Sequence, residues 1–263
     1  MRGGTMLKTV QASRASLMVQ QLQMATVGNN VANVNTAGYK ADKPQTDFTD
    51  AVRQAMSANG TTVQSETDIV PTVGTGMRVI MQNKKDFSQG HIKETGRELD
   101  VAIDGRGFFE VTDGENTRYT RSGVFKLSSE GDLVTPAGYQ LKGVKIPSET
   151  KEIIIEKDGS VTAVSYEEEK ENAGNITLQY FENPSNLKPV GKNMFSAGIE
   201  MEKTENIPEE DKGVLLQSHL EMSNVDLTDE FARMIVSQKS HSFQSKAITT
   251  ADEMWGIANQ LRR

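Results

Sequence analysis

Hydrophobic residues recur every seven positions near the start of the chain, between residues 6 and 34. They are Val10, Leu17, Met24 and Val31, with Met18, Ala25 and Ala32 beside them. This spacing places them on one side of an α-helix, and no proline interrupts the segment. The positions that would widen the apolar side are Leu7, Arg14, Gln21 and Gly28. The predicted helix therefore has a narrow, half-polar seam, which fits either a coiled-coil strand or an ordinary surface helix.

The pattern loses its period between residues 41 and 95. Thr, Ser, Gly and Val dominate this stretch, which predicts an extended, loop-rich linker with one or two strands. Residues 48–56, "FTDAVRQAM", could form a short helix within it.

From about residue 96 to residue 200 the hydrophobic period becomes two. Leu99, Val101 and Ile103 occupy alternate positions, and short runs of the same kind follow at regular spacing. Asp158-Gly159 stands between two such runs, which is a strong signal for a hairpin turn. Gly105 and Gly107 are expected to let a tight turn deliver the next two phenylalanines to the core. The segment predicts a compact, mostly antiparallel β domain.

The last forty residues return to a helical period. Asp226 is expected to cap the helix by accepting from the amides of Thr228 and Asp229. Apolar or small residues then follow at spacings of four and three, namely Phe243, Ala247, Thr250, Met254, Ile257 and Leu261. This second terminal helix also has a narrow apolar seam.

Together these patterns predict a mixed α and β fold. We expect an N-terminal helix segment over 6–40, a linker over 41–95, an all-β central domain over 96–222 and a C-terminal helix over 223–263. Isolated helices with narrow seams are marginal in water, because packing must offset their ordering entropy. The two terminal helices should therefore pack on each other as a coiled-coil-like unit, on neighbouring copies, or both.

Composition excludes several classes of protein. A net charge of -7 and a pI of about 5.2 argue against nucleic-acid binding, which needs clustered Lys and Arg. The chain has no cysteine, so disulfides and thiolate chemistry are excluded. No apolar run is long enough to cross a bilayer, and the N-terminus lacks the apolar stretch of a signal peptide. This predicts a cytoplasmic protein, or one exported without a cleaved signal peptide. Residues 1–5 could be a leader.

Candidate catalytic groups are scattered. His91, His219 and His241 share no ligand spacing, so neither a metal site nor a cofactor site is expected. The "DGRGFF" stretch lacks the context of a nucleotide-binding loop. Four carboxylates could in principle include a pair for glycoside cleavage, although each stands where turns and strand edges favour aspartate. They are Asp100, Asp104, Asp113 and Asp132.

The exit from the first helix, "VANVNTAGYK" (residues 31–40), is unusually rich in polar residues. Asn33 and Asn35 can satisfy backbone groups at the helix end through their amides. Gly38 can adopt the left-handed conformation that closes a helix, and Tyr39 and Lys40 then leave in an extended direction. We interpret the stretch as an exit that fixes the direction of the chain. An ordinary helix end would need only Gly38.

Four blocks of the chain resemble the bacterial flagellar rod and hook proteins. They are "NNVANVNTAGYK", "LDVAIDGRGFFEV" with "YTRSGVFKLSSEGDLVTPAGYQLKG", "NITLQYFENPSNLKPVGKNMF", and "LEMSNVDLTDEFARMIVSQKSHSFQSKAITTADEMW". The resemblance is poor from Ala41 to Phe87, and no large outer domain of hook proteins is present, which favours a rod protein. The residues that carry the two terminal motifs are Asn30, Asn33, Asn35, Thr36, Gly38, Tyr39 and Lys40, and Ser223, Asn224, Val225 and Asp226.

The resemblance implies a structural subunit of the flagellar basal-body rod. Such a subunit would be exported unfolded by the flagellar type III apparatus into the cell envelope, in the periplasm or cell-wall zone. Its ends would fold on joining copies of itself and other rod and hook proteins, forming a helical tube that transmits torque from motor to hook. No enzyme activity, membrane insertion or nucleic-acid partner is expected. Two alternatives stay open: a rod-associated cell-wall-active enzyme, and an adaptor that does not polymerise.

Overall fold

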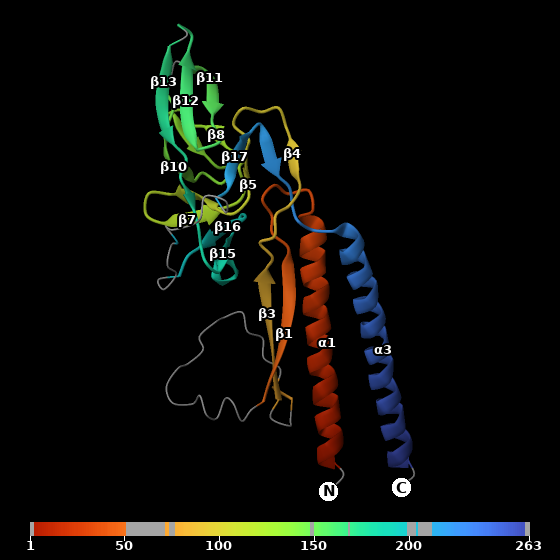
Figure 1. Ribbon diagram of the computed structural model, residues 1–263. Coiled ribbons are helices and arrows are strands. Elements are labelled where there is room, and N and C mark those ends of the chain that lie inside the picture. The colour runs from red at the N-terminus through yellow and green to blue at the C-terminus, as the bar shows by residue number, and fades with distance from the viewer. Residues whose placement is uncertain are drawn as a thin grey trace, which may run out of the picture. The chain divides into compact units, whose positions relative to one another are not determined.

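The computed structural model describes residues 3–50, 72–73, 77–147, 150–167, 169–198, 204 and 212–260 (Figure 1). The chain divides into two compact units. The first, here called the helical unit, comprises Met1–Ala32, Asp42–Lys85 and Asp226–Arg263. The second, here called the β unit, comprises Asn33–Ala41 and Asp86–Val225. The architecture is mixed, with helices in one unit and a largely antiparallel set of strands in the other.

Two long antiparallel helices form the main part of the helical unit. Helix α1 runs from Gly3 to Ala32 and helix α3 from Leu227 to Gln260. Asn30 Nδ2 donates to Glu230 Oε1 over 2.9 Å, and ten residues away Gln20 Nε2 donates to Ser240 Oγ. The helices thus meet through polar side chains. No helix in the described residues is long and apolar enough to cross a membrane.

A small sheet completes the helical unit. Its strands are β1 (Asp42–Asp50), β2 (Thr72–Val73) and β3 (Met77–Lys85), in the order β1-β3-β2. Strands β1 and β3 pair in continuous antiparallel register from Asp42 opposite Lys85 to Asp50 opposite Met77. Residues 48–50 of the stretch considered for a short helix therefore lie in a strand, so that prediction is wrong there. Residues 51–56 lie outside the described residues.

The β unit is built from short antiparallel strands. Its largest sheet has the order β11-β12-β13-β10-β6-β7-β16-β15, with β14 on β6 and the β8–β9 pair on β10. Strand β17 pairs with β5, and β18 with β4. The bounds are β4 Ile92–Glu94, β5 Val101–Asp104, β6 Phe108–Thr112, β7 Thr117–Thr120, β8 Lys126–Leu127, β9 Asp132–Val134, β10 Gln140–Lys145, β11 Thr150–Ile155, β12 Ser160–Ser165, β13 Lys170–Asn175, β14 Leu178–Gln179, β15 Lys188–Gly191, β16 Met194–Ser196, β17 Val214–Gln217 and β18 His219–Glu221.

Successive residues of β6 fill two apolar clusters of the β unit. Phe109 packs edge-to-face against Phe125 in the larger cluster, with ring centroids 5.3 Å apart. Phe108 points to the other side of the strand and packs in an aromatic cluster with Tyr119 and Phe181. Both phenylalanines are buried, so the expected delivery of these side chains to the core is confirmed. The expected Asp158-Gly159 hairpin is also confirmed, because it joins the paired strands β11 and β12.

Helix α3 presents its apolar residues away from α1. Glu230 and Ser237, which face α1, are buried, whereas Phe243 and Ile257 are 71% and 58% exposed. At roughly 100° per residue, the buried polar positions and the exposed apolar positions fall on opposite sides of the helix. The apolar seam expected from residue 243 onward is therefore not the surface that α3 turns to α1.

Candidate functional site: the joint between the two chain-end motifs

Hydrogen bonds join the two terminal motifs inside the β unit. Gly38 N–H donates to the carbonyl of Glu221 over 2.8 Å, and Ala41 N–H donates to Asn224 Oδ1 over 2.8 Å. Asn224 Nδ2 in turn donates to the carbonyl of Asp86 (2.8 Å) and to both oxygens of Ser88 (3.1 and 3.0 Å). One asparagine side chain thus ties three segments that lie far apart in the sequence.

A buried ion cluster lies beside this hydrogen-bond network. Lys40 Nζ is 2.6 Å from Glu221 Oε1, and Arg121 Nη1 is 3.3 Å from Glu221 Oε2. The side chains of Lys40 and Glu221 are each only 1% exposed. Backbone groups satisfy further polar atoms, since Lys40 Nζ donates to Ser88 O and the amide of Gly90 donates to Glu221 Oε1. A buried charge is tolerated only with such partners.

Burial and charge act in opposite directions on the two cations. Removal from water lowers the pKa of Lys40, and the negative charge of Glu221 acts against this shift. The pKa of Arg121 is lowered by burial too, and again Glu221 opposes the change. Glu221 therefore makes the largest opposing contribution to the lowered pKa of both buried cations.

The turn before Lys40 requires glycine. Gly38 has a φ of 69°, and a Cβ at this position would lie 2.4 Å from the amide nitrogen of Ser122. Thr36 N–H donates to the carbonyl of Asn33, and its hydroxyl donates to Asn33 Oδ1 over 3.2 Å. Tyr39 is buried. The backbone of 33–38 is thus folded tightly enough to place Lys40 in the interior.

The remaining motif residues of the β unit play smaller parts. Ser223 is buried and its hydroxyl accepts from the amide of Val225 over 3.3 Å. Asn35 is exposed, and no hydrogen bond from its side chain is found within the described residues. Our prediction that the Asn35 amide satisfies the helix end is therefore not borne out by these contacts.

Two motif residues belong to the helical unit and act there. Asn30 exchanges hydrogen bonds with the backbone of Asp42, donating to its carbonyl and accepting from its amide, both over 2.9 Å. Asp226 Oδ1 accepts from the amides of Thr228 and Asp229 over 2.8 and 3.4 Å. These bonds to the ionised carboxylate lower the pKa of Asp226. Asp226 is the N-cap of α3.

Neither Glu221 nor Arg121 stands in a sequence pattern that marks it as a site residue. Arg121 lies 100 positions from Glu221, and Lys40 lies 181 positions from it. A charged residue in a short strand is usually exposed, so the pattern alone carries no signal for burial.

The four candidate carboxylates of the β unit have local structural partners. Asp113 Oδ1 accepts from the amides of Glu115 and Asn116, which lowers its pKa. Asp100 is buried and accepts from the hydroxyl of Thr95 over 2.8 Å. Asp104 accepts from Gln89 and Asp132 from Gln140. Within the described part of the chain, no cluster of His, Asp and Glu could hold a metal ion.

Relatives match the chain over its whole length. The flagellar basal-body rod protein FlgG of Bacillus subtilis is 36% identical over 269 residues, covering 98% of this chain and 100% of the relative. FlgG of Borreliella burgdorferi is 36% identical over 267 residues, covering 98% and 100%. The flagellar hook-basal body complex protein FlhP of Bacillus subtilis is 30% identical over 275 residues, again covering 98% and 100%.

The chain belongs to the flagellar basal-body rod protein family. Three family descriptions match separate segments: "Flagella basal body rod protein" at residues 11–40, "Flagellar hook protein FlgE/F/G D1 domain" at 102–163, and "Flagellar basal body rod FlgEFG protein C-terminal" at 216–261. Lys40, Arg121 and Glu221 each fall in a different one of these segments. The ion cluster of Lys40, Arg121 and Glu221, together with the neighbouring hydrogen bonds of Gly38 and Asn224, is here called the joint. The joint connects residues from all three segments of this rod protein, whose function is that of a structural subunit.

Proposed function

We propose that this rod protein assembles with copies of itself into a helical tube that transmits torque from the flagellar motor to the hook. The observation that carries the proposal is the exposed apolar side of α3. In the described residues, seven of the twelve exposed large hydrophobic side chains belong to this helix. They are Leu227, Phe231, Ile235, Val236, Phe243, Met254 and Ile257.

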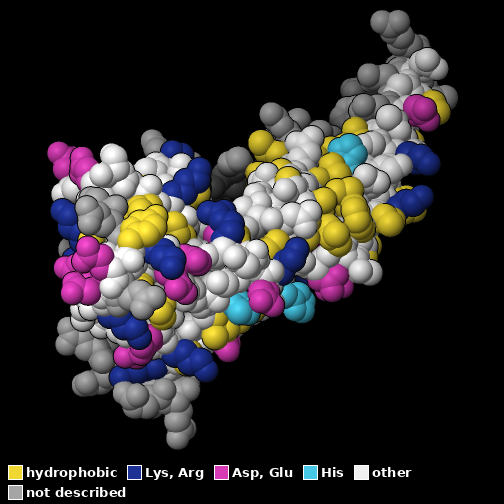
Figure 2. All heavy atoms as spheres, turned by 90° about the horizontal axis from the view of Figure 1, so that it is seen from above, with side chains coloured by type: hydrophobic (Ala, Val, Ile, Leu, Met, Phe, Trp, Pro, Cys, Tyr) yellow, Lys and Arg dark blue, Asp and Glu magenta, His cyan; other side chains and the backbone are white. Residues whose placement is uncertain are grey.

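An exposed stripe of this kind marks an association surface. Large contiguous apolar patches are rare on monomeric soluble proteins, because covering them releases about 25 cal/mol for each Å² removed from water. Apolar side chains lie open at the surface in Figure 2, with lysine and arginine side chains beside them. Because α1 packs on the opposite, polar side of α3, other copies are the natural cover for the stripe.

The terminal helices are proposed to complete their folding during assembly. In the tube, α1 and α3 would pair as a coiled-coil-like unit whose apolar edges are closed by neighbours. Such coupled folding would delay polymerisation until a subunit reaches the growing end. A chain without cysteine suits export in an unfolded state by the type III apparatus, followed by assembly with rod and hook proteins in the periplasm or cell-wall zone.

The motif residues are proposed to serve this assembly indirectly. The joint of Gly38, Lys40 and Asn224 would hold the two chain ends where they leave the β unit. This assignment, and the division into segments 6–40, 41–95, 96–222 and 223–263, belong to the same proposal.

A double substitution on the exposed side of α3 tests the proposal. Phe243→Ser with Ile257→Ser should abolish tube formation, seen by negative-stain microscopy and sedimentation, and should abolish motility when it replaces the natural protein. Tyr166→Ser is the matched control, because Tyr166 is 74% exposed on the β unit. Tubes of unchanged length and number from the double variant would refute the proposal.

The same microscopy separates the two alternatives. A wild-type protein that stays monomeric at every concentration would favour the adaptor that does not polymerise. No contact among the described residues favours the cell-wall-active enzyme, since the candidate carboxylates are engaged in turns and local hydrogen bonds.

A further inference from the structure

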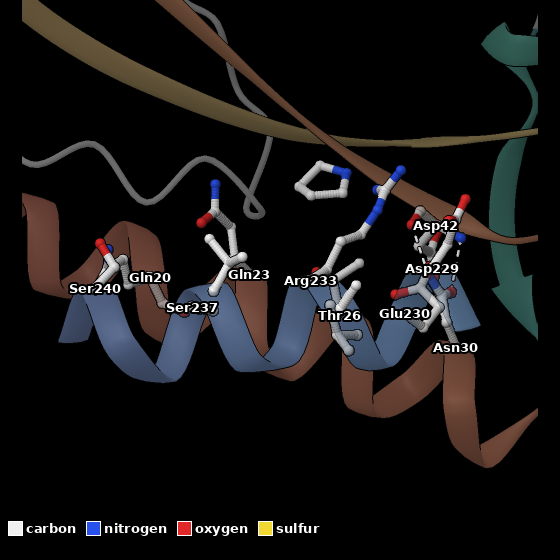
Figure 3. Close-up of a pocket in the computed structure, with 14 residues that line it drawn as sticks. Gln20, Gln23, Thr26, Asn30, Asp42, Asp229, Glu230, Arg233, Ser237 and Ser240 are labelled. Atoms are coloured by element: carbon white, nitrogen blue, oxygen red, sulfur yellow. Dashed lines mark hydrogen bonds between the residues drawn. The ribbon is translucent and has the colours of Figure 1, made fainter. Parts of the chain in front are cut away.

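A groove lined by both polar and apolar side chains, Val27 and Val236 among the latter, runs along α1 and α3 in the helical unit. It encloses about 540 Å³ and is lined by side chains of both helices and of β1. Figure 3 shows Gln20 and Ser240 at one end of it, and Asn30, Asp42 and Glu230 at the other. Ten residues of helix separate Gln20 from Asn30, which corresponds to about 15 Å along the axis.

Two buried oxygen atoms of groove residues have no hydrogen-bond partner. Glu230 is 6% exposed; its Oε1 accepts from Asn30, whereas its Oε2 has no partner. Gln20 is 8% exposed; its Nε2 donates to Ser240, whereas its Oε1 has no partner. Both unsatisfied atoms are acceptors. A buried acceptor is costly until it receives a donor, so each end of the groove is prepared for an N–H group.

The charge of the groove favours a cation. Its described lining includes three acidic residues, Asp42, Asp229 and Glu230, and one basic residue, Arg233. Asp42 is already paired with Lys85, at 2.9 Å. Glu230 therefore remains the buried carboxylate of the lining whose second oxygen has no hydrogen-bond partner.

A matching surface exists on the other side of α3. Lys239 and Lys246 are exposed and lie seven residues apart, about 10 Å along the helix axis. Helical geometry places both on the same side as the exposed Phe231, Ile235 and Phe243. This outer surface thus combines two ammonium groups with apolar side chains that need covering.

We propose that the groove binds the outer side of α3 of a second copy of this chain, with Lys239 of that copy at Glu230 and Lys246 toward the Gln20 end. The inference rests on the proposed self-assembly and names its contact. Neighbouring α3 helices then run parallel, displaced by nine residues or about 14 Å. Each copy offers one groove and one outer surface, so the contact is head-to-tail and continues indefinitely, as a tube requires.

The absence of cysteine allows a direct test with full-length chains. Asp229→Cys places a thiol at the exposed rim of the groove next to Glu230, and Ser242→Cys places one on the outer surface, one turn from Lys239, which is kept. The two single variants are oxidised separately and as a mixture. The mixture should form disulfide-linked dimers at least about tenfold faster than either variant alone, because docking raises the effective thiol concentration. The control mixture is Asp229→Cys with Lys188→Cys, an exposed lysine of β15.

Tubes in the microscope without faster cross-linking in the first mixture would overturn the groove contact while leaving the assembly proposal intact. Absence of tubes from the wild-type chain would overturn both. Equal cross-linking in the control mixture would also count against the groove.

A second pair of variants tests the ion pair itself. Glu230→Gln keeps an acceptor for Asn30 but removes the charge, and Lys239→Gln changes an exposed side chain. Each should raise the concentration needed for assembly about tenfold, and the double variant should raise it no further, because the two changes remove one interaction. Additive effects, or no effect of either change, would refute the pairing.

Discussion

The β unit keeps Val101, Ile103 and Phe109 at 0% exposure, whereas in the helical unit Phe243 and Ile257 are 71% and 58% exposed. The contrast does not extend to polar groups. Lys40 and Glu221 of the β unit have several partners each, but Asp100 Oδ1 and Arg121 Nε of that unit are buried without a hydrogen-bond partner, as are Glu230 Oε2 and Gln20 Oε1 of the helical unit.

The difference in apolar burial indicates two kinds of stability. A unit that buries most of its large apolar side chains in a core has an energetic reason to fold alone. In the helical unit the apolar side of α3 stays exposed. We therefore expect the β unit to be stable by itself and the helical unit to gain stability when other copies cover that side. Three substitution experiments test this difference between the units.

The largest difference is expected from matched phenylalanine substitutions. Phe109→Ala removes a ring from the closed core and should lower the free energy of unfolding by about 3–5 kcal/mol. Phe243→Ala should change it by less than about 0.5 kcal/mol, because that ring is exposed in the single subunit. Urea unfolding below the assembly concentration, followed by circular dichroism, measures both. Equal losses in the free energy of unfolding would show that Phe243 is already buried in the monomer.

A smaller loss is expected from neutralising the ion cluster. Glu221→Gln keeps the shape of the side chain but removes the charge shared by Lys40 and Arg121, and should cost about 1.5–3 kcal/mol in the same unfolding experiment. The pKa of Lys40 should fall further, which NMR of its ammonium group can follow. Glu230→Gln is the comparison in the helical unit, and we expect it to leave the stability of the monomer nearly unchanged. If the Glu221→Gln variant had the same free energy of unfolding as the wild type, the joint would not depend on this charge.

The smallest effect concerns the cap of α3 and its pH dependence. The pKa of Asp226 is lowered in the folded chain by hydrogen bonds from Thr228 and Asp229. Its contribution is therefore complete above the ordinary aspartate pKa of about 3.9 and is lost as the pH falls through the lowered pKa. Hydrogen exchange at the Thr228 amide should accelerate over that acidic range in the wild type. Asp226→Asn keeps an acceptor and should show no such step; an identical step would assign it to another group.

Much of the fold follows from patterns that act locally. The period of two predicts the strands of the β unit because alternate residues of a strand share one face, as Val101 and Ile103 do. Ala102 between them is also buried, so β5 is covered on both faces. The role of Asp226 is predictable because an aspartate just before a helix can cap the backbone amides of the first turn without a partner from elsewhere in the chain. The β1–β3 ladder is different. Its first strand, β1, is polar and contains Pro44, and it is tolerated because β1 lies at the edge of its sheet in the order β1-β3-β2.

Only part of the site can be predicted from the sequence. The N-terminal motif indicates a tight turn, and Gly38 can be assigned from its neighbours. Nothing near Glu221 or Arg121 indicates that they meet, since burial of a charge depends on partners far away in the chain. The same holds for α3: spacing identifies which residues share a side, but polar contacts such as that of Asn30 with Glu230 decide which side meets α1.

The ion pair between Lys40 and Glu221 can form only in a chain that extends at least to residue 221. Ribosomes deliver a chain from its N-terminus, so Lys40 emerges 181 residues before the carboxylate it needs. Any product that stops short of residue 221 would contain the two cations Lys40 and Arg121 but would lack Glu221, the carboxylate that contacts both. Such a fragment would fold incompletely and would be accessible to proteases. Only full-length subunits would then be available for assembly.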